Sequence, residues 1–200
     1  MLLVLGPWER ARARAASRAS VARVTAAHSA GLDLSALHAR VEGALARWPV
    51  DRPRISRHAG LLLVDALPPR AMFAALAVVL RGDAWACGVF LRPPTDPRLS
   101  ATHLIGEARK SAWGVAVRRD PSDPAALPVH AALGPHATLL RQRSEAVWTA
   151  VDAVSVHRTA TAAARELGCA QQTVSRHLAR ADLAAAAQTR VVVEALLAAR

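Results

Sequence analysis

The residues whose types and spacing point most clearly to chemistry lie near the end of the chain, from Thr159 to Arg180. The second half of this segment is rich in polar side chains that can contact bases or phosphates. These polar residues are Gln171, Gln172, Thr173, Ser175, Arg176 and Arg180. No acidic residue lies between Ala170 and Ala181, so nothing in this stretch repels a phosphate backbone. The composition therefore predicts a surface that binds duplex DNA.

Two short helices joined by a tight turn would present these side chains. Thr159 can accept a hydrogen bond from a free amide and begin the first helix, and Gly168 can adopt the left-handed conformation that ends it. The small side chain of Ala164 lets the helices approach where they cross. We expect Leu167 to pack beneath the turn and Cys169 to fill it as a small apolar residue.

The second of these helices carries its apolar residues on one face. Val174 and Leu178 are four residues apart, so both face the core and the polar residues face outward. The pattern predicts a helix-turn-helix, and the alternative is a helical hairpin with a glycine turn in an alanine-rich chain. Ala170 and Ala162 stand where a capping residue and a capping-box glutamate are common, so both helix starts are weakened.

The overall charge favours an anionic partner. The chain has 200 residues and a formal net charge of +11, which suits nucleic acid or an anionic membrane surface. A general arginine bias is the alternative, because Lys110 is the one lysine. Cys87 and Cys169 lie far apart and the histidines lack ligand spacing, so we expect no metal, no cofactor and reduced thiols.

The apolar stretches are too short for targeting or for a membrane span. The apolar start of residues 1–5 is shorter than a signal-peptide core, and its charges follow it instead of preceding it. The apolar run Ala71–Leu80 is half the length that crosses a bilayer. We therefore expect a cytoplasmic protein without a membrane partner.

Strand and helix patterns alternate before residue 134. Residues 1–18 are interpreted as a basic leader or arm, and residues 19–134 as one α+β domain. Its expected elements, in order, are strand Ser20–Ala27, helix Leu34–Trp48, strands Arg54–His58 and Gly60–Val64, helix Pro69–Leu80, strand Ala84–Leu91, helix Ser100–Val117 and strand Val129–Leu133. This order predicts a ferredoxin-like sandwich with its helices on one face of the sheet.

Residues 141–200 are predicted to be an all-α helix-turn-helix domain, set off by Gly134-Pro135 and the polar stretch Arg141–Ser144. Its expected helices are Glu145–Val154, Thr159–Leu167, Gln171–Arg180 and Leu183–Ala199. The last helix carries an apolar stripe that either covers the helix-turn-helix core or pairs two copies of the chain. The stripe comprises Leu183, Ala187, Val191, Val192 and Leu196.

The combined layout resembles the SatD family, in which a domain related to nucleotide cyclases precedes a helix-turn-helix. The segment Ile105–Ala112 is similar to the Gly-x-Ala-Arg-x-Ala helix of cyclase-like domains, and Ala84–Leu91 to the strand before it. Trp148 and the residues through Leu178 resemble the end of that family. The resemblance implies a cyclase-like sandwich in the first part of the chain.

The metal-binding carboxylates of active cyclases have no counterpart here. The resemblance places them on the first strand and in the hairpin turn, where Ser20–Ala27 has no acid and His58-Ala59 replaces the expected Gly-Asp. Two-metal phosphoryl chemistry needs such carboxylates to hold magnesium. Asp65 is the nearest acid. We expect no catalytic residues and no enzyme activity.

These observations predict a DNA-binding transcriptional regulator whose first domain senses an unknown effector or mediates dimerisation. A homodimer is expected, because one helix-turn-helix covers few base pairs and two can occupy a symmetric site one helical turn apart. Two alternatives remain. The first is a divergent nucleotide-processing enzyme, and the second is a helix-turn-helix that docks to another protein such as RNA polymerase.

Overall fold

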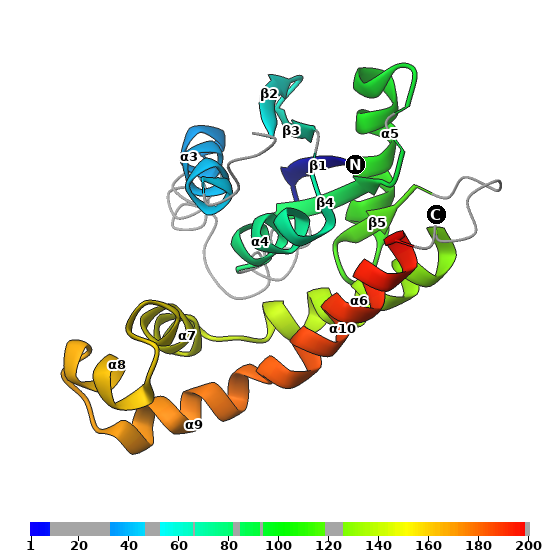
Figure 1. Ribbon diagram of the computed structural model, residues 1–200. Helices are drawn as coiled ribbons and strands as arrows, with labels where there is room; N and C mark the ends of the chain where they lie inside the picture. The colour runs from blue at the N-terminus through cyan, green and yellow to red at the C-terminus, as the bar shows by residue number, and fades with distance from the viewer. Residues whose placement is uncertain are drawn as a thin grey trace, which may run out of the picture.

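A computed structural model describes residues 1–8, 33–46, 53–65, 67–81, 85–92, 94–118 and 126–198. A sheet with flanking helices forms one part of the molecule, and three helices form another, from which the last helix returns toward the sheet (Figure 1). The elements are β1 Leu2–Pro7, α3 Leu34–Leu45, β2 Arg54–His58, β3 Leu61–Asp65, α4 Pro69–Val79, β4 Trp85–Phe90, α5 Pro97–Lys110, β5 Val115–Val117, α6 Ala126–Arg141, α7 Glu145–His157, α8 Ala160–Glu166, α9 Gln171–Ala181 and α10 Leu183–Ala198. We call β1–β5 with α3–α6 the sheet unit, and α7–α9 the three-helix unit.

The first strand lies in the middle of the sheet, whose strand order is β2-β3-β1-β4-β5. Val4 of β1 lies opposite Leu63 of β3 and Gly88 of β4, both in antiparallel pairings. β5 extends the sheet beyond β4 in a parallel pairing. The interpretation of residues 1–18 as a leader is therefore wrong for residues 2–7. An unbroken apolar run without alternation is typical of a strand buried on both faces. The strand expected at Ser20–Ala27 lies outside the described residues.

Helices cover both faces of the sheet, which corrects the expectation that they cover one. α5 packs on the face that carries Leu2, Val4 and Phe90. α3, α4 and α6 cover the opposite face. α5 approaches closely because Gly88 has no side chain, and a Cβ there would lie 2.7 Å from the Cγ of Leu104. α5, which lies between β4 and β5, accounts for the second covered face.

One predicted helix of the sheet unit has different bounds, and one predicted strand is wrong. The helix expected over 100–117 spans Pro97–Lys110, because Asp96 caps its start and Gly114, at φ 66°, reverses the chain into β5. The strand expected at Val129–Leu133 lies inside α6, which also runs through Gly134-Pro135. A short apolar run is compatible with a strand or with a buried helix. In the structure this segment is helical, and the ring of Trp113 packs against Gly134 of the same helix.

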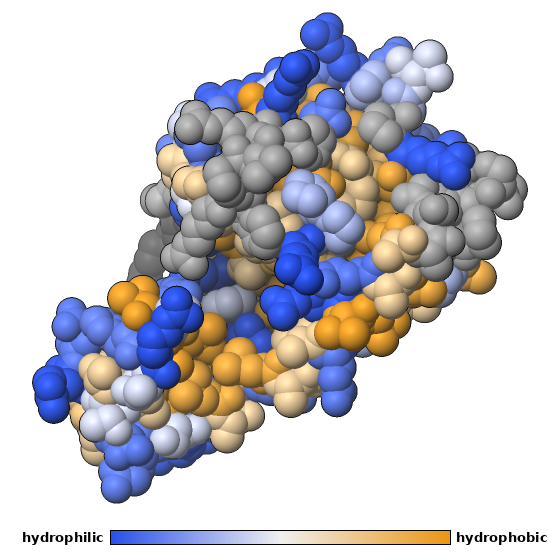
Figure 2. Space-filling view, viewed as in Figure 1, coloured by the Kyte–Doolittle hydropathy of each residue, from blue (hydrophilic) through white to orange (hydrophobic). Residues whose placement is uncertain are grey.

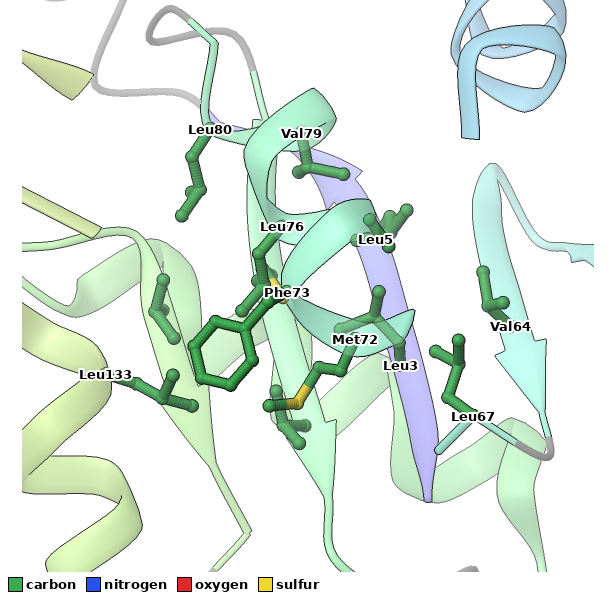
Figure 3. Packing of buried hydrophobic residues seen from close by; sticks show 14 of the residues in the cluster. Leu3, Leu5, Val64, Leu67, Met72, Phe73, Leu76, Val79, Leu80 and Leu133 are labelled. Atoms are coloured by element: carbon green, nitrogen blue, oxygen red, sulfur yellow. The ribbon is translucent and has the colours of Figure 1, made fainter. Parts of the chain in front are cut away.

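The β2–β3 hairpin and α4 are confirmed. Ala59 and Gly60 have φ values of 47° and 74°, the left-handed pair that suits a tight hairpin. In the core, Phe73 of α4 points toward Leu133 of α6, whereas Met72 lies toward Leu3 of β1 (Figure 3). Of the helices within the described ranges, none is long and apolar enough to cross a bilayer.

Candidate nucleic-acid interface

The three-helix unit is held together by a small core made largely of alanine. α7, α8 and α9 each contact the other two. Ala150, Ala163, Ala164 and Val174 are buried at their centre, and Leu178 packs against them while partly exposed. Because alanine side chains are small, the helix axes can approach closely, and even short helices make many van der Waals contacts.

Local capping fixes where these helices begin. The Ser144 hydroxyl accepts a hydrogen bond from the Val147 amide at 3.4 Å at the start of α7. The Thr159 hydroxyl accepts one from the Ala162 amide at 3.1 Å at the start of α8. Arg158, at φ 67°, separates the two helices. Ala170, which precedes α9, provides no side-chain cap.

The turn between α8 and α9 is formed by backbone groups. Gly168 has φ 62°, and the Cys169 amide donates to the Ala164 carbonyl at 3.0 Å. Two expectations about this turn are wrong, because Leu167 is 37% exposed and lies outside the core, and Cys169 is exposed. The surrounding core residues are alanines, whose side chains are too short to cover a leucine at the end of a helix.

α9 presents a polar face to solvent. Val174 is buried on its inner side. The predicted contact residues Gln171, Gln172, Ser175, Arg176 and Arg180 are exposed, and Thr173 is half-buried. Hydrophilic residues gather over the α8–α9 end of the molecule, whereas apolar residues form a broken band along α10 (Figure 2). The α9 surface thus combines amide, hydroxyl and guanidinium groups on one rigid element.

The carboxylate that lies nearest to α9 in the sequence caps the next helix. Asp182 follows α9 at φ 45°, and its Oδ1 accepts a hydrogen bond from the Ala185 amide at 3.2 Å at the start of α10. Arg143, which is 8% exposed, donates from Nε to the Ala181 carbonyl at 2.9 Å. Burial lowers the pKa of Arg143, and Asp182 opposes that shift. The C-terminal end of α9 is therefore held by the Arg143 hydrogen bond, and Asp182 caps the helix that follows.

A cation–π arrangement fixes the three-helix unit to the sheet unit. The guanidinium carbons of Arg143 and Arg81 lie 4.9 Å and 5.6 Å from the ring centroid of buried Trp148. Arg81, just after α4, also pairs with Asp152 at 2.8 Å and with Glu145. The hydrogen bond to Glu145 raises the pKa of Arg81 and lowers that of Glu145. Sequence spacing gave no signal for these contacts, because their partners come from different units.

α10 belongs with the sheet unit by its contacts, which are with α6 and α4. Its inward residue is Val193, and Leu196 and Leu197 pack against the same core. The predicted stripe on α10 is thus corrected: four of its members are exposed and Leu196 is half-buried. The exposed four are Leu183, Ala187, Val191 and Val192. The stripe does not cover the core of the three-helix unit.

The end of β1 is surrounded by arginine and tryptophan side chains. Trp8 Nε1 donates to the Arg109 carbonyl at 3.1 Å, and Arg109 Nε donates to the Pro7 carbonyl at 2.8 Å. The guanidinium carbon of Arg141 lies 4.1 Å from the Trp8 ring centroid. Asp65 lies at the opposite end of β3 from the hairpin turn. Within the described ranges, no three His, Cys, Asp or Glu side chains lie close enough to hold a metal.

Comparisons with protein-family models and with curated proteins give no match. Among solved structures, the chain is similar to the regulator of polyketide synthase expression from Bifidobacterium adolescentis, at 17% identity and a TM-score of 0.25. The match covers 100% of this chain and 78% of that one.

Proposed function

We propose that this protein is a DNA-binding transcriptional regulator in which α8 and α9 form a helix-turn-helix. The observation that carries the proposal is the outward face of α9. It is polar, contains two exposed arginines, and has no acidic residue between Ala170 and Ala181. In this proposal the protein works in the cytoplasm.

In this proposal α9 is the recognition helix and lies in the major groove. Its first turn approaches the base edges, where Gln171 and Gln172 can form hydrogen bonds with adenine. The Ser175 hydroxyl can donate or accept a hydrogen bond and so suits more than one base. Arg176 and Arg180 hold phosphate or the edge of guanine. Thr173, which is half-buried, contributes less than its exposed neighbours.

The sheet unit is proposed to be a ferredoxin-like, cyclase-like domain of the SatD type without catalytic activity. Its support is the order β2-β3-β1-β4, with each neighbouring pair antiparallel, as in a split βαβ sandwich. The hairpin turn is Ala59-Gly60 and β1 has no acid, so neither of these two described segments carries a carboxylate for magnesium. The domain would sense an effector or mediate dimerisation, without a metal or cofactor.

Dimerisation is proposed because two copies of α9 can read a symmetric site one helical turn apart. The exposed residues Val191 and Val192 of α10 offer an apolar contact outside the core. Light scattering over a concentration series tests this, with twice the 21.1 kDa chain mass expected. A monomer mass throughout, with one chain bound per duplex, would contradict it.

The decisive experiment removes the two arginines of α9. Fluorescence anisotropy with a labelled duplex of mixed sequence measures affinity over a salt series for the full chain and for the double variant Arg176→Ala, Arg180→Ala. We expect a loss of about 1–3 kcal/mol for each arginine that contacts DNA. The slope of log K against log salt should fall by about 2, as expected for two lost phosphate contacts.

The matched control is the double variant Arg98→Ala, Lys110→Ala, which removes two exposed positive charges from α5. It should bind nearly as well as the unmodified chain. Equal losses in both double variants would mean that net charge alone attracts DNA. Absence of duplex binding at low salt would overturn the proposal and favour a protein partner for α9.

A further inference from the structure

The three-helix unit is joined to the rest of the chain at one end. Residues 142–144 lead into α7, and Asp182 separates α9 from α10. These two connections lie side by side, because Arg143 in the first donates from Nε to the carbonyl of Ala181, just before the second, at 2.9 Å. α7, α8 and α9 contact one another, whereas α10 returns to α6 and α4 (Figure 1). We call residues 142–144 together with Asp182 the neck.

The backbone of the neck lies between helices and not within them. Asp182 has φ 45°, so the helical hydrogen-bond ladder is interrupted between α9 and α10. Residues 142–144 separate α6 from α7 in the same way. Hinges in proteins are typically a few residues at the ends of elements, which absorb the change in φ and ψ. The two connections are therefore suited to act together as one hinge.

One large side chain of the three-helix unit enters the main core close to the neck. Trp148, near the start of α7, is 5% exposed and belongs to the same buried cluster as Leu80 and Leu140. Among the described residues its Nε1 has no hydrogen-bond partner, so no directional polar contact fixes the indole ring. Since apolar burial is non-directional, Trp148 can serve as a pivot while it keeps the unit attached.

One arginine of the sheet unit holds α7 at two points. Arg81 donates from Nε to Glu145 Oε2 at 3.3 Å and from Nη2 to the other oxygen of the same carboxylate. Its Nη1 donates to Asp152 Oδ2 at 2.8 Å. Asp152 lies about two helical turns beyond Glu145, so the two contacts together fix the direction of α7 from the neck. We call these three residues the latch.

The latch is strong enough to favour one orientation and open enough to release it. Exposed ion pairs are weak and are screened by salt, whereas a two-pronged arginine shared by two carboxylates is stronger than an isolated pair. The Arg81 side chain is 27% exposed, and those of Glu145 and Asp152 are 76% and 58% exposed. Arg40 of α3 adds a weaker attraction to Glu145. Salt and competing ions can therefore reach the latch.

We propose that the three-helix unit turns as a rigid body about the neck, and that Arg81 is the latch residue that holds the orientation described above. When the ion pairs break, the unit stays folded, because α7, α8 and α9 share their own core. It stays attached through the neck and Trp148. The direction of α9 relative to the sheet unit then changes. This inference does not depend on what α9 binds.

Single-molecule fluorescence resonance energy transfer on the full chain measures this orientation. Cys169 is exposed at the α8–α9 turn and provides one dye site, and Leu99→Cys, at an exposed position of α5, provides the other. Cys87 should remain unlabelled, because it is buried and burial raises the pKa of its thiol. With the latch intact at low salt, we expect one narrow distribution of transfer efficiency.

Arg81→Ala should increase the population of other orientations by about tenfold, the change that loss of one charge-assisted hydrogen bond produces. In the unmodified latch, raising salt from about 0.01 M to about 1 M should act in the same direction, because the screening length falls from about 30 Å to about 3 Å. Arg70→Ala is the matched control. It removes an ion pair between α4 and α10, with Arg70 Nε 3.5 Å from Glu194 Oε2, and should leave the distribution unchanged.

Hydrogen exchange separates a turn of the unit from its unfolding. In Arg81→Ala the amides of α8 and α9, and those of β1 and β4, should keep their protection. A transfer distribution that changes neither in Arg81→Ala nor at high salt would overturn the proposal. A changed distribution with loss of protection in α8 and α9 would also overturn it, because the unit would then unfold instead of turning.

Discussion

The sheet unit and the three-helix unit bury very different side chains. The first buries large groups on both faces of its sheet, such as Leu3 on one face and Phe90 and Leu104 on the other. The second buries mainly alanine, with Ala163 and Ala164 between α8 and α9. Because hydrophobic stabilisation grows with buried apolar area, at about 25 cal/mol per Å², most of it must come from the sheet unit.

This difference shows how a small recognition element can remain ordered with little core of its own. Alanine has high helix propensity, and side-chain caps at Ser144 and Thr159 begin two of the helices. The unit is also attached to the sheet unit through Trp148 and the two arginines that contact its ring. Local helix stability and one anchored tryptophan thus take the place of a large core, and leave the outer face of α9 free.

The largest effect should follow from opening a cavity in the sheet unit. Leu3 is fully buried in the central strand, so Leu3→Ala should lower the free energy of unfolding by about 2–5 kcal/mol. Urea unfolding followed by circular dichroism measures the change. The control is Leu99→Ala, since Leu99 is 75% exposed and its loss should change stability by less than about 0.5 kcal/mol. Comparable changes in both variants would contradict the assignment of the main core.

A smaller and more local effect is expected where α8 meets α9. Ala164 is 4% exposed, so Ala164→Leu should force the helices apart at a cost of about 1–3 kcal/mol. Hydrogen exchange should then quicken in α8 and α9, while β1 and β4 keep their protection. Ala179→Leu, at an exposed position of α9, is the control and should leave exchange unchanged. Faster exchange throughout the sheet after Ala164→Leu would show that the stability of the sheet unit depends on the packing of the three-helix unit.

The smallest effect concerns pH and His136 of α6. Burial, and to a lesser extent Arg143, lowers the pKa of His136 from 6.5 to about 4. Between these values the unfolded chain binds a proton that the folded chain does not, so stability falls as pH is lowered through this window. Urea unfolding should show a loss of about 1–2 kcal/mol between about pH 7 and about pH 5 from this residue. His136→Leu should show a shallower pH dependence, and an identical dependence in both proteins would sink the assignment.

Sequence patterns were most informative where a single helix and its ends decide the structure. The four helices from Glu145 onward have nearly the expected boundaries, because capping residues and a glycine turn act within a few residues. The same pattern placed Val174 inward and the polar residues of α9 outward, as the structure has them. The expectation for Leu167 failed because the pattern assumed a larger core than the neighbouring alanines provide.

The sequence by itself determined the helical boundaries and the outward polar face of α9, because those features depend on hydrogen bonds and side-chain spacing within one segment. Tertiary structure alone decided that residues 2–7 form the central strand, that Val129–Leu133 is helical, and that α5 covers the second face. It also decided the meeting of Arg81 with Trp148 and the packing of α10 on α4. These features depend on which distant segments pack together, and short apolar runs or single arginines do not specify their partners.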